Sequence, residues 1–110
     1  MPGDLFTRDE VLLCTYAARF DVDDLGGVEA IQSLRRRSAG SIRMKIQNIA
    51  SMLDEEGIQR ESDVSPLTGR PPGESGRRTN WDWVEPLVPL SRSELLSKCK
   101  AVLAAPIERA

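Results

Sequence analysis

Apolar residues recur at helical spacing in several parts of the chain, and no stretch alternates as a strand would. The first part follows a capping box, Thr7–Glu10, and continues to about Phe20. The second runs over about 25–36, and the third runs from Ile42 to Leu53 and ends before a glycine. Each of these parts predicts one helix with an apolar side.

The composition changes between residues 61 and 80, where Pro, Gly, Ser and Arg accumulate. Such a segment predicts a long flexible loop. Apolar side chains return at Trp81, and a second capping box, Ser91–Glu94, predicts a last helix over 91–104. The whole pattern predicts an all-α protein, a compact bundle of four to five helices in a single domain with one long Pro/Gly-rich loop.

A rotation of about 100° per residue predicts which side of the third helix each side chain occupies. The core edge is Ile42, Ile46, Ile49 and Leu53. The far side holds Ser41, Met44, Asn48 and Ser51, with Arg43 and Gln47 on one shoulder and Lys45 on the other.

The formal net charge of -2 hides a basic island. Residues 1–29 carry seven acids and two bases, whereas residues 30–53 carry five bases and no acid. These five bases, the basic island, are Arg35, Arg36, Arg37, Arg43 and Lys45. The predicted loop adds Arg70, Arg77 and Arg78. The island lies where the second predicted helix meets the third.

The layout of this joint resembles a helix-turn-helix over residues 24–56, with a four-residue break at Ser38–Ser41 that contains Gly40. It favours binding of double-stranded DNA through residues 35–48. The candidates for phosphate contact are Arg35, Arg36, Arg37, Ser38, Ser41 and, from the loop, Arg70, Arg77 and Arg78. The candidates for base contact are Arg43, Gln47 and Asn48.

Structural roles remain open for the same residues. An arginine triplet at a helix end also stabilises the negative end of the helix dipole. Lys45 can lie along the edge of the core with its charge at the surface, and Met44 can pack against the loop. Trp81 and Trp83 are expected to cover the core rather than to stack on bases.

The composition argues against several kinds of chemistry. The chain has no histidine, which removes the commonest general base and the HNH type of nuclease centre. Cys14 and Cys99 are too few for a structural zinc site and are expected to be buried, unpaired thiols. We therefore expect no catalytic activity, no metal and no cofactor. No apolar run approaches the roughly 18 residues of a membrane span, and the chain starts without a secretory signal, so the expected location is the cytoplasm.

The run Arg37–Ile49 resembles the pattern R-S/T-x-G-S/A-V-x-M-K-L-x-N in the N-terminal domains of bacterial HNH restriction endonucleases of the modification-dependent, McrA-like type. The opening Phe6–Leu13 is similar to the first helix of those domains, and together the likeness spans about 6–53. A weaker likeness exists to Myb/SANT helices. Six residues match the longer pattern, and the resemblance implies that they contact DNA: Arg37, Ser38, Ser41, Met44, Lys45 and Asn48.

The resemblance implies a helical module that contacts DNA and is normally fused to a nuclease. No HNH segment follows here, so cleavage is not carried over. The expected role is target recognition in a bacterial restriction or phage-defence system, on plain or modified duplex DNA and alongside a separate nuclease subunit. The alternative is a protein-interaction adaptor or an antagonist of such a nuclease, with the acidic segments as its contact surface.

Overall fold

The computed structural model describes residues 6–65 and 80–104. These residues form the α-helices α1 (Arg8–Arg19), α2 (Val28–Arg35), α3 (Ala39–Glu55), α4 (Trp81–Val84) and α5 (Arg92–Ala104), with the 3-10 turns η2 (Val22–Leu25) and η3 (Glu85–Leu87). The described part of the chain contains no strand, so the all-α prediction is confirmed.

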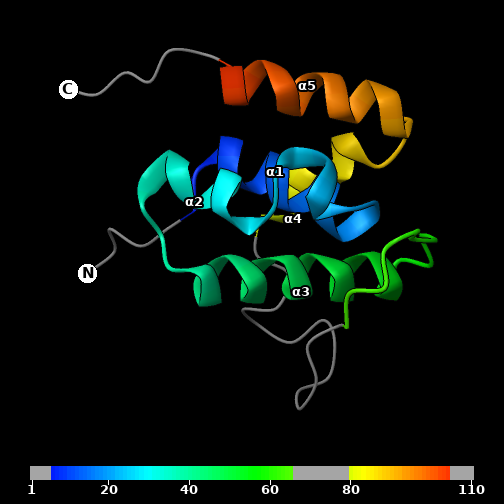
Figure 1. The fold of residues 1–110 in the computed structure, drawn as a ribbon. Helices are drawn as coiled ribbons and strands as arrows, with labels where there is room; N and C mark the ends of the chain where they lie inside the picture. Colours follow the sequence, from blue (N-terminus) through cyan, green and yellow to red (C-terminus); the bar gives the residue numbers. More distant parts are fainter. Residues whose placement is uncertain (1–5, 66–79, 105–110) are drawn as a thin grey trace.

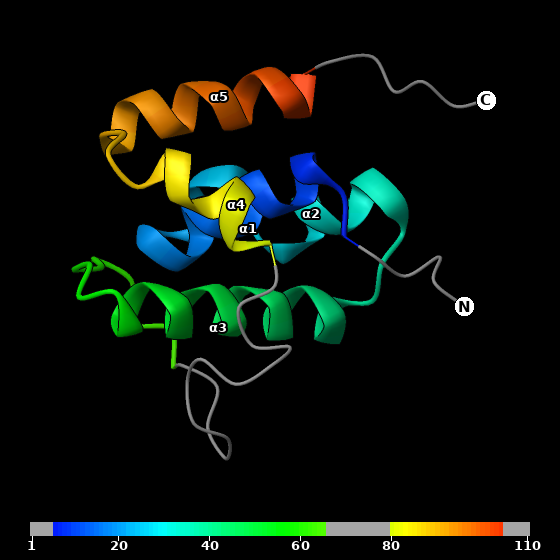
Figure 2. The same cartoon turned by 180° about the vertical axis from the view of Figure 1, so that it is seen from behind.

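Helix α1 is the centre of the molecule, with α3 along one side and α5 along the other (Figure 1). The view from behind shows α4 lying against α1 (Figure 2). Every residue from Val11 to Ala18 except Leu12 is buried. A helix that is covered on nearly all sides carries apolar residues around its whole circumference, and α1 does so.

The helix ends follow the local signals. The Glu10 amide donates to Thr7 Oγ1 at 3.3 Å and the Thr7 amide donates to Glu10 Oε1 at 2.8 Å, so the first capping box is formed. The Ser91 amide donates to Glu94 Oε1 at 2.8 Å in the second box. Gly57, with a φ of 74°, follows the end of α3 in the left-handed conformation expected of it.

The joint between α2 and α3 differs from the prediction. The break is three residues long, Arg36–Ser38, and Gly40 lies inside the first turn of α3. Ser38 is the N-cap, because its Oγ accepts the Ser41 amide at 3.1 Å, and the helix starts directly after it. The helix expected over 25–36 is also divided. Gly26 and Gly27, with φ values of 102° and 93°, separate η2 from a shorter α2.

The second half of α3 is enclosed, with six consecutive buried residues at 48–53. The prediction that Asn48 and Ser51 lie on the solvent side is therefore wrong, since they are only 7% and 6% exposed. Periodicity within one helix cannot reveal that a second layer covers its outer side. At the neighbouring shoulder of α3, Lys45 donates to Asn80 at the start of α4.

The predicted loop 61–80 begins with an anchored segment. The Glu61 amide donates to the Arg19 carbonyl at 2.8 Å, and the Ser62 hydroxyl donates to the Ala18 carbonyl at 2.5 Å. These bonds connect residues 61–62 to the end of α1, and residues 61–65 form no helix or strand, as a loop would. Residues 66–79, with Arg70, Arg77 and Arg78, lie outside the described residues.

Three further expectations concern the core and its cover. Cys14 and Cys99 are both buried and unpaired, as predicted. Trp81 and Trp83 are partly buried against the hydrophobic core, which confirms them as core-covering side chains. Within the described ranges, no helix combines the length and the apolar character that crossing a membrane requires.

Candidate nucleic-acid interface

The turn that joins α2 to α3 is fixed by one hydrogen bond between backbone groups and one from a side chain to the backbone. Arg36 ends α2 in a left-handed conformation (φ 58°, ψ 37°), and its amide donates to the Gln32 carbonyl at 2.7 Å. The Gln32 side-chain amide donates to the Arg37 carbonyl at 2.9 Å. The backbone of this turn is therefore held in place independently of the arginine side chains.

Arg37 points inward rather than toward solvent. Its Nε and Nη2 donate to the two carboxylate oxygens of Glu10 at 2.7 and 3.0 Å, and its guanidinium lies 3.9 Å from the centre of the Phe6 ring. Burial alone would raise the pKa of the Glu10 carboxyl, but hydrogen bonds from Arg37 and Thr7 outweigh it and lower that pKa. The pair fastens the turn to the start of α1, so Arg37 belongs to the interior.

Lys45 is also an interior residue and is 7% exposed. Its Nζ donates to Asn80 Oδ1 at 2.7 Å and to Asn48 Oδ1 at 3.4 Å. Burial lowers the pKa of Lys45 to about 8, although the nearby Cys14 thiol acts in the opposite direction. Lys45 and Asn48 thus connect α3 to the start of α4, and neither side chain is presented to a partner.

The rest of the basic island remains at the surface. Arg35, Arg36 and Arg43 are exposed, and none of them makes an ion pair with any residue that the structure describes. Met44 is 60% exposed beside them. Other arginines are paired: Arg60 Nε lies 2.8 Å from Asp54 Oδ1, and Arg92 bridges two acids.

We define the basic turn surface as the exposed polar and apolar side chains of the turn and the first half of α3. It consists of Arg35, Arg36, Ser38, Ser41, Arg43 and Met44, with the half-buried Gln47 at its edge. Ser38 Oγ accepts the Ser41 amide as the cap of α3, whereas Ser41 is an exposed residue. Of the candidates predicted over residues 35–48, the exposed ones thus lie in the turn and in the first half of α3.

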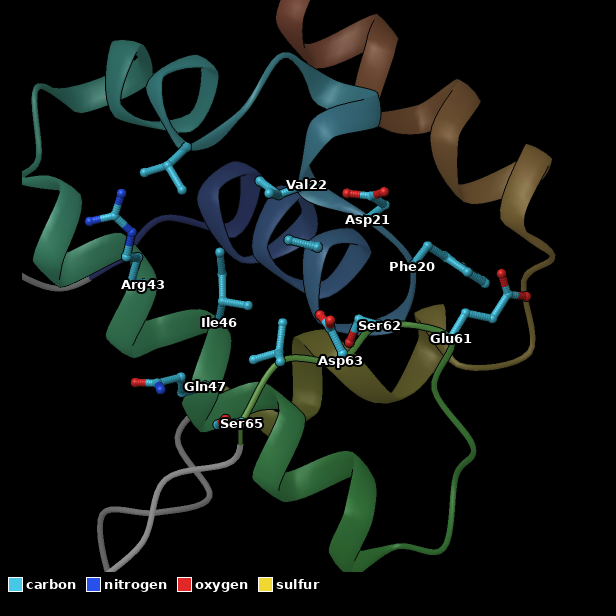
Figure 3. Close-up of a pocket in the computed structure, with 13 residues that line it drawn as sticks. Phe20, Asp21, Val22, Arg43, Ile46, Gln47, Glu61, Ser62, Asp63 and Ser65 are labelled. Atoms are coloured by element: carbon cyan, nitrogen blue, oxygen red, sulfur yellow. The ribbon is translucent and has the colours of Figure 1, made fainter.

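A pocket of about 530 Å³ adjoins this surface between α1, η2, α2, α3 and residues 61–65 (Figure 3). Arg43 and Gln47 line one side of it, and Asp21 and Asp63 also line it. Sequence reasoning missed the two aspartates because they are 42 residues apart, and nothing local signals that they meet. Among the described residues, no group of three or more potential metal-binding side chains gathers anywhere.

Comparison with known proteins gives no protein-family model, no curated protein and no solved structure that matches the chain. The resemblance of residues 6–53 to the N-terminal domains of HNH endonucleases stays a prediction. So do the predictions that the chain is not an enzyme and uses no cofactor.

Proposed function

We propose that this chain is a DNA-binding, target-recognition module that contacts the duplex through the basic turn surface. The observation that carries the proposal is the gathering of Arg35, Arg36 and Arg43, exposed and without a carboxylate partner in the described residues, around the N-terminus of a 17-residue helix. Exposed cations near amides at the positive end of a helix dipole attract phosphate oxygens.

The pattern of burial along α3 is compatible with DNA contact through the N-terminal half of the helix. In helix-turn-helix proteins, the N-terminal residues of the second helix approach the base edges. Arg43 and Gln47 lie one turn apart on the same shoulder of α3, and their side chains have the donors and acceptors that read guanine and adenine. The enclosed residues 48–53 leave the second half of α3 to the core.

The conformation of Arg36 supports a role for its side chain. A φ of 58° is unfavourable for any residue with a Cβ and is most readily adopted by glycine. Glycine would adopt this backbone conformation with less strain, yet the residue at this position is an exposed arginine. Arg36→Gly therefore removes the cation while keeping the turn, which makes it a clean test.

The experiment measures binding of the full chain to plain and modified duplexes by fluorescence anisotropy at several salt concentrations. We expect Arg36→Gly to lower affinity about tenfold on all sequences and to reduce the salt slope by about 1, because it removes one phosphate contact. Arg43→Gln should weaken binding most on duplexes with guanine at the contacted position, because Arg43 is proposed to read a base edge. Lys98→Gln, on the exposed side of α5, is the matched control and should bind like the wild type.

Absence of binding to both duplexes at low salt would overturn the proposal. The assignment to a bacterial restriction or phage-defence system rests on the resemblance of residues 6–53, and a separate nuclease is its expected partner. The competing function is a protein-interaction adaptor or nuclease antagonist. The exposed acids of residues 21–24 and 54–56 favour it, and it predicts association with a nuclease and no binding to DNA.

A further inference from the structure

The pocket beside α3 has an apolar floor. Ala17 of α1, Val22 of η2, Val28 of α2 and Ile46 of α3 line it, and its volume of about 530 Å³ falls in the range of small-molecule sites. A ligand that buries an aliphatic segment on this floor gains free energy in proportion to the apolar area removed from water.

The wall formed by residues 61–65 is held from both ends. Ser62 and Glu61 are bonded to the last turn of α1. The Arg60 guanidinium is paired with Asp54 at 2.8 and 2.9 Å, and it also donates to the Val64 carbonyl at 3.0 Å. The hollow is therefore built before a ligand arrives, and binding does not have to order this wall.

Opposite charges lie on opposite sides of the hollow. Figure 3 shows Arg43 on one side and Asp21 and Asp63 on the other, with Ile46 and Val22 between them. Arg43 is too far from either aspartate to form an ion pair. The third acid that lines the pocket, Glu61, forms an ion pair with Arg92 at 2.8 Å, which compensates its charge.

We propose that this pocket binds a small zwitterion with an aliphatic middle. Its anionic end, a carboxylate, pairs with Arg43, its ammonium end pairs with Asp63 and Asp21, and its methylene groups cover Ile46 and Val22. A ligand with one charged end would pair with only one side of the pocket, and the charged groups on the other side would stay solvated. Two sources carry this chemistry: a free ω-amino acid and the C-terminal lysine of a partner polypeptide.

The test is a titration of the ¹⁵N-labelled full chain, followed by NMR, with 6-aminohexanoate, hexylamine, hexanoate and hexanol. We expect 6-aminohexanoate to bind about tenfold more tightly than each of the three others, with shifts concentrated at Val22, Ile46 and Val64. Shorter and longer ω-amino acids then measure the spacing of the two ends. A tripeptide ending in lysine, with free or amidated C-terminus, separates the two sources.

Variants assign each end of the ligand. Asp63→Asn should remove the advantage of 6-aminohexanoate over hexanoate, and Arg43→Gln should remove its advantage over hexylamine. Glu85→Gln and Lys98→Gln, which are exposed and outside the pocket, are the matched controls and should keep both preferences.

Equal binding of all four compounds, or no shift at millimolar concentration, would overturn the proposal. Stronger binding of hexylamine or hexanoate than of the zwitterion would overturn it as well. No DNA is present in this titration, so its result does not depend on the function proposed for the basic turn surface, although Arg43 belongs to both.

Discussion

The five bases of the basic island divide into two groups, one exposed to solvent and one enclosed by the protein. Arg35, Arg36 and Arg43 are exposed and make no ion pair within the described residues, whereas Arg37 and Lys45 are interior. All five lie within eleven residues of one another, and the sequence presents them as one cluster. The two groups differ in what surrounds the charge. The exposed arginines face solvent, whereas Arg37 contacts Glu10 and Lys45 contacts Asn80.

This difference teaches that a basic cluster in a sequence is not yet a basic surface. A buried charge needs a partner, and removing that partner from a buried pair leaves an uncompensated ion in the interior. Substituting a charged residue at the surface changes the free energy of unfolding only slightly. Stability measurements should therefore separate the two groups even before any ligand is known.

The largest expected effect is on the buried pair. Arg37→Ala leaves the fully buried Glu10 carboxylate without its main partner, so we expect the free energy of unfolding to fall by about 3 kcal/mol in urea denaturation. Arg35→Ala, two residues away and exposed, should stay within about 0.5 kcal/mol of the wild type. Adding Glu10→Gln to Arg37→Ala should restore part of the loss. Equal effects of the two single substitutions would contradict the division.

The second effect is a pH dependence at Lys45. Its folded pKa of about 8 lies below its ordinary value of 10.5, so the folded state carries a poorly solvated cation below pH 8. Between those values the unfolded chain binds more protons, and stability rises with pH. The gain is about 1 kcal/mol between pH 7 and pH 9.

Lys45→Met supplies the reference for this measurement. Burial raises the pKa of the Cys14 and Cys99 thiols to about 12, so both lower stability above pH 9 in wild type and variant alike. The difference in unfolding free energy between wild type and variant should therefore rise from pH 7 to pH 9. A flat difference would place Lys45 at the surface.

The smallest effect applies the same comparison to two serines. Ser38 Oγ caps α3 and accepts the Ser41 amide, so Ser38→Ala should cost about 1 kcal/mol. Ser41 is exposed, and Ser41→Ala should change stability by less than about 0.5 kcal/mol. Thermal unfolding of the two variants side by side decides whether the cap role of Ser38 is real.

Helix ends are local events, which is why they were predictable. The capping boxes at Thr7 and Ser91 and the glycine at position 57 act within one turn of the chain, and the structure has each of them. The predicted position of the break between α2 and α3 was wrong, because Gly40 indicated that the chain turns there. In the structure the chain turns at Arg36 instead, which is a residue whose side chain gives no sign of a left-handed conformation.

The sequence by itself determined the all-α class, the limits of α1, the start of α5, the core edge of α3 and the buried, unpaired cysteines. These follow from spacing and capping, which depend on neighbours three or four residues away. Only the tertiary structure decided which bases reach solvent, that the outer side of α3 is covered over 48–53, and that Asp21 and Asp63 share a pocket with Arg43. Those outcomes depend on contacts between helices far apart in the chain, such as Arg37 with Glu10 and Lys45 with Asn80, and no local pattern carries that information.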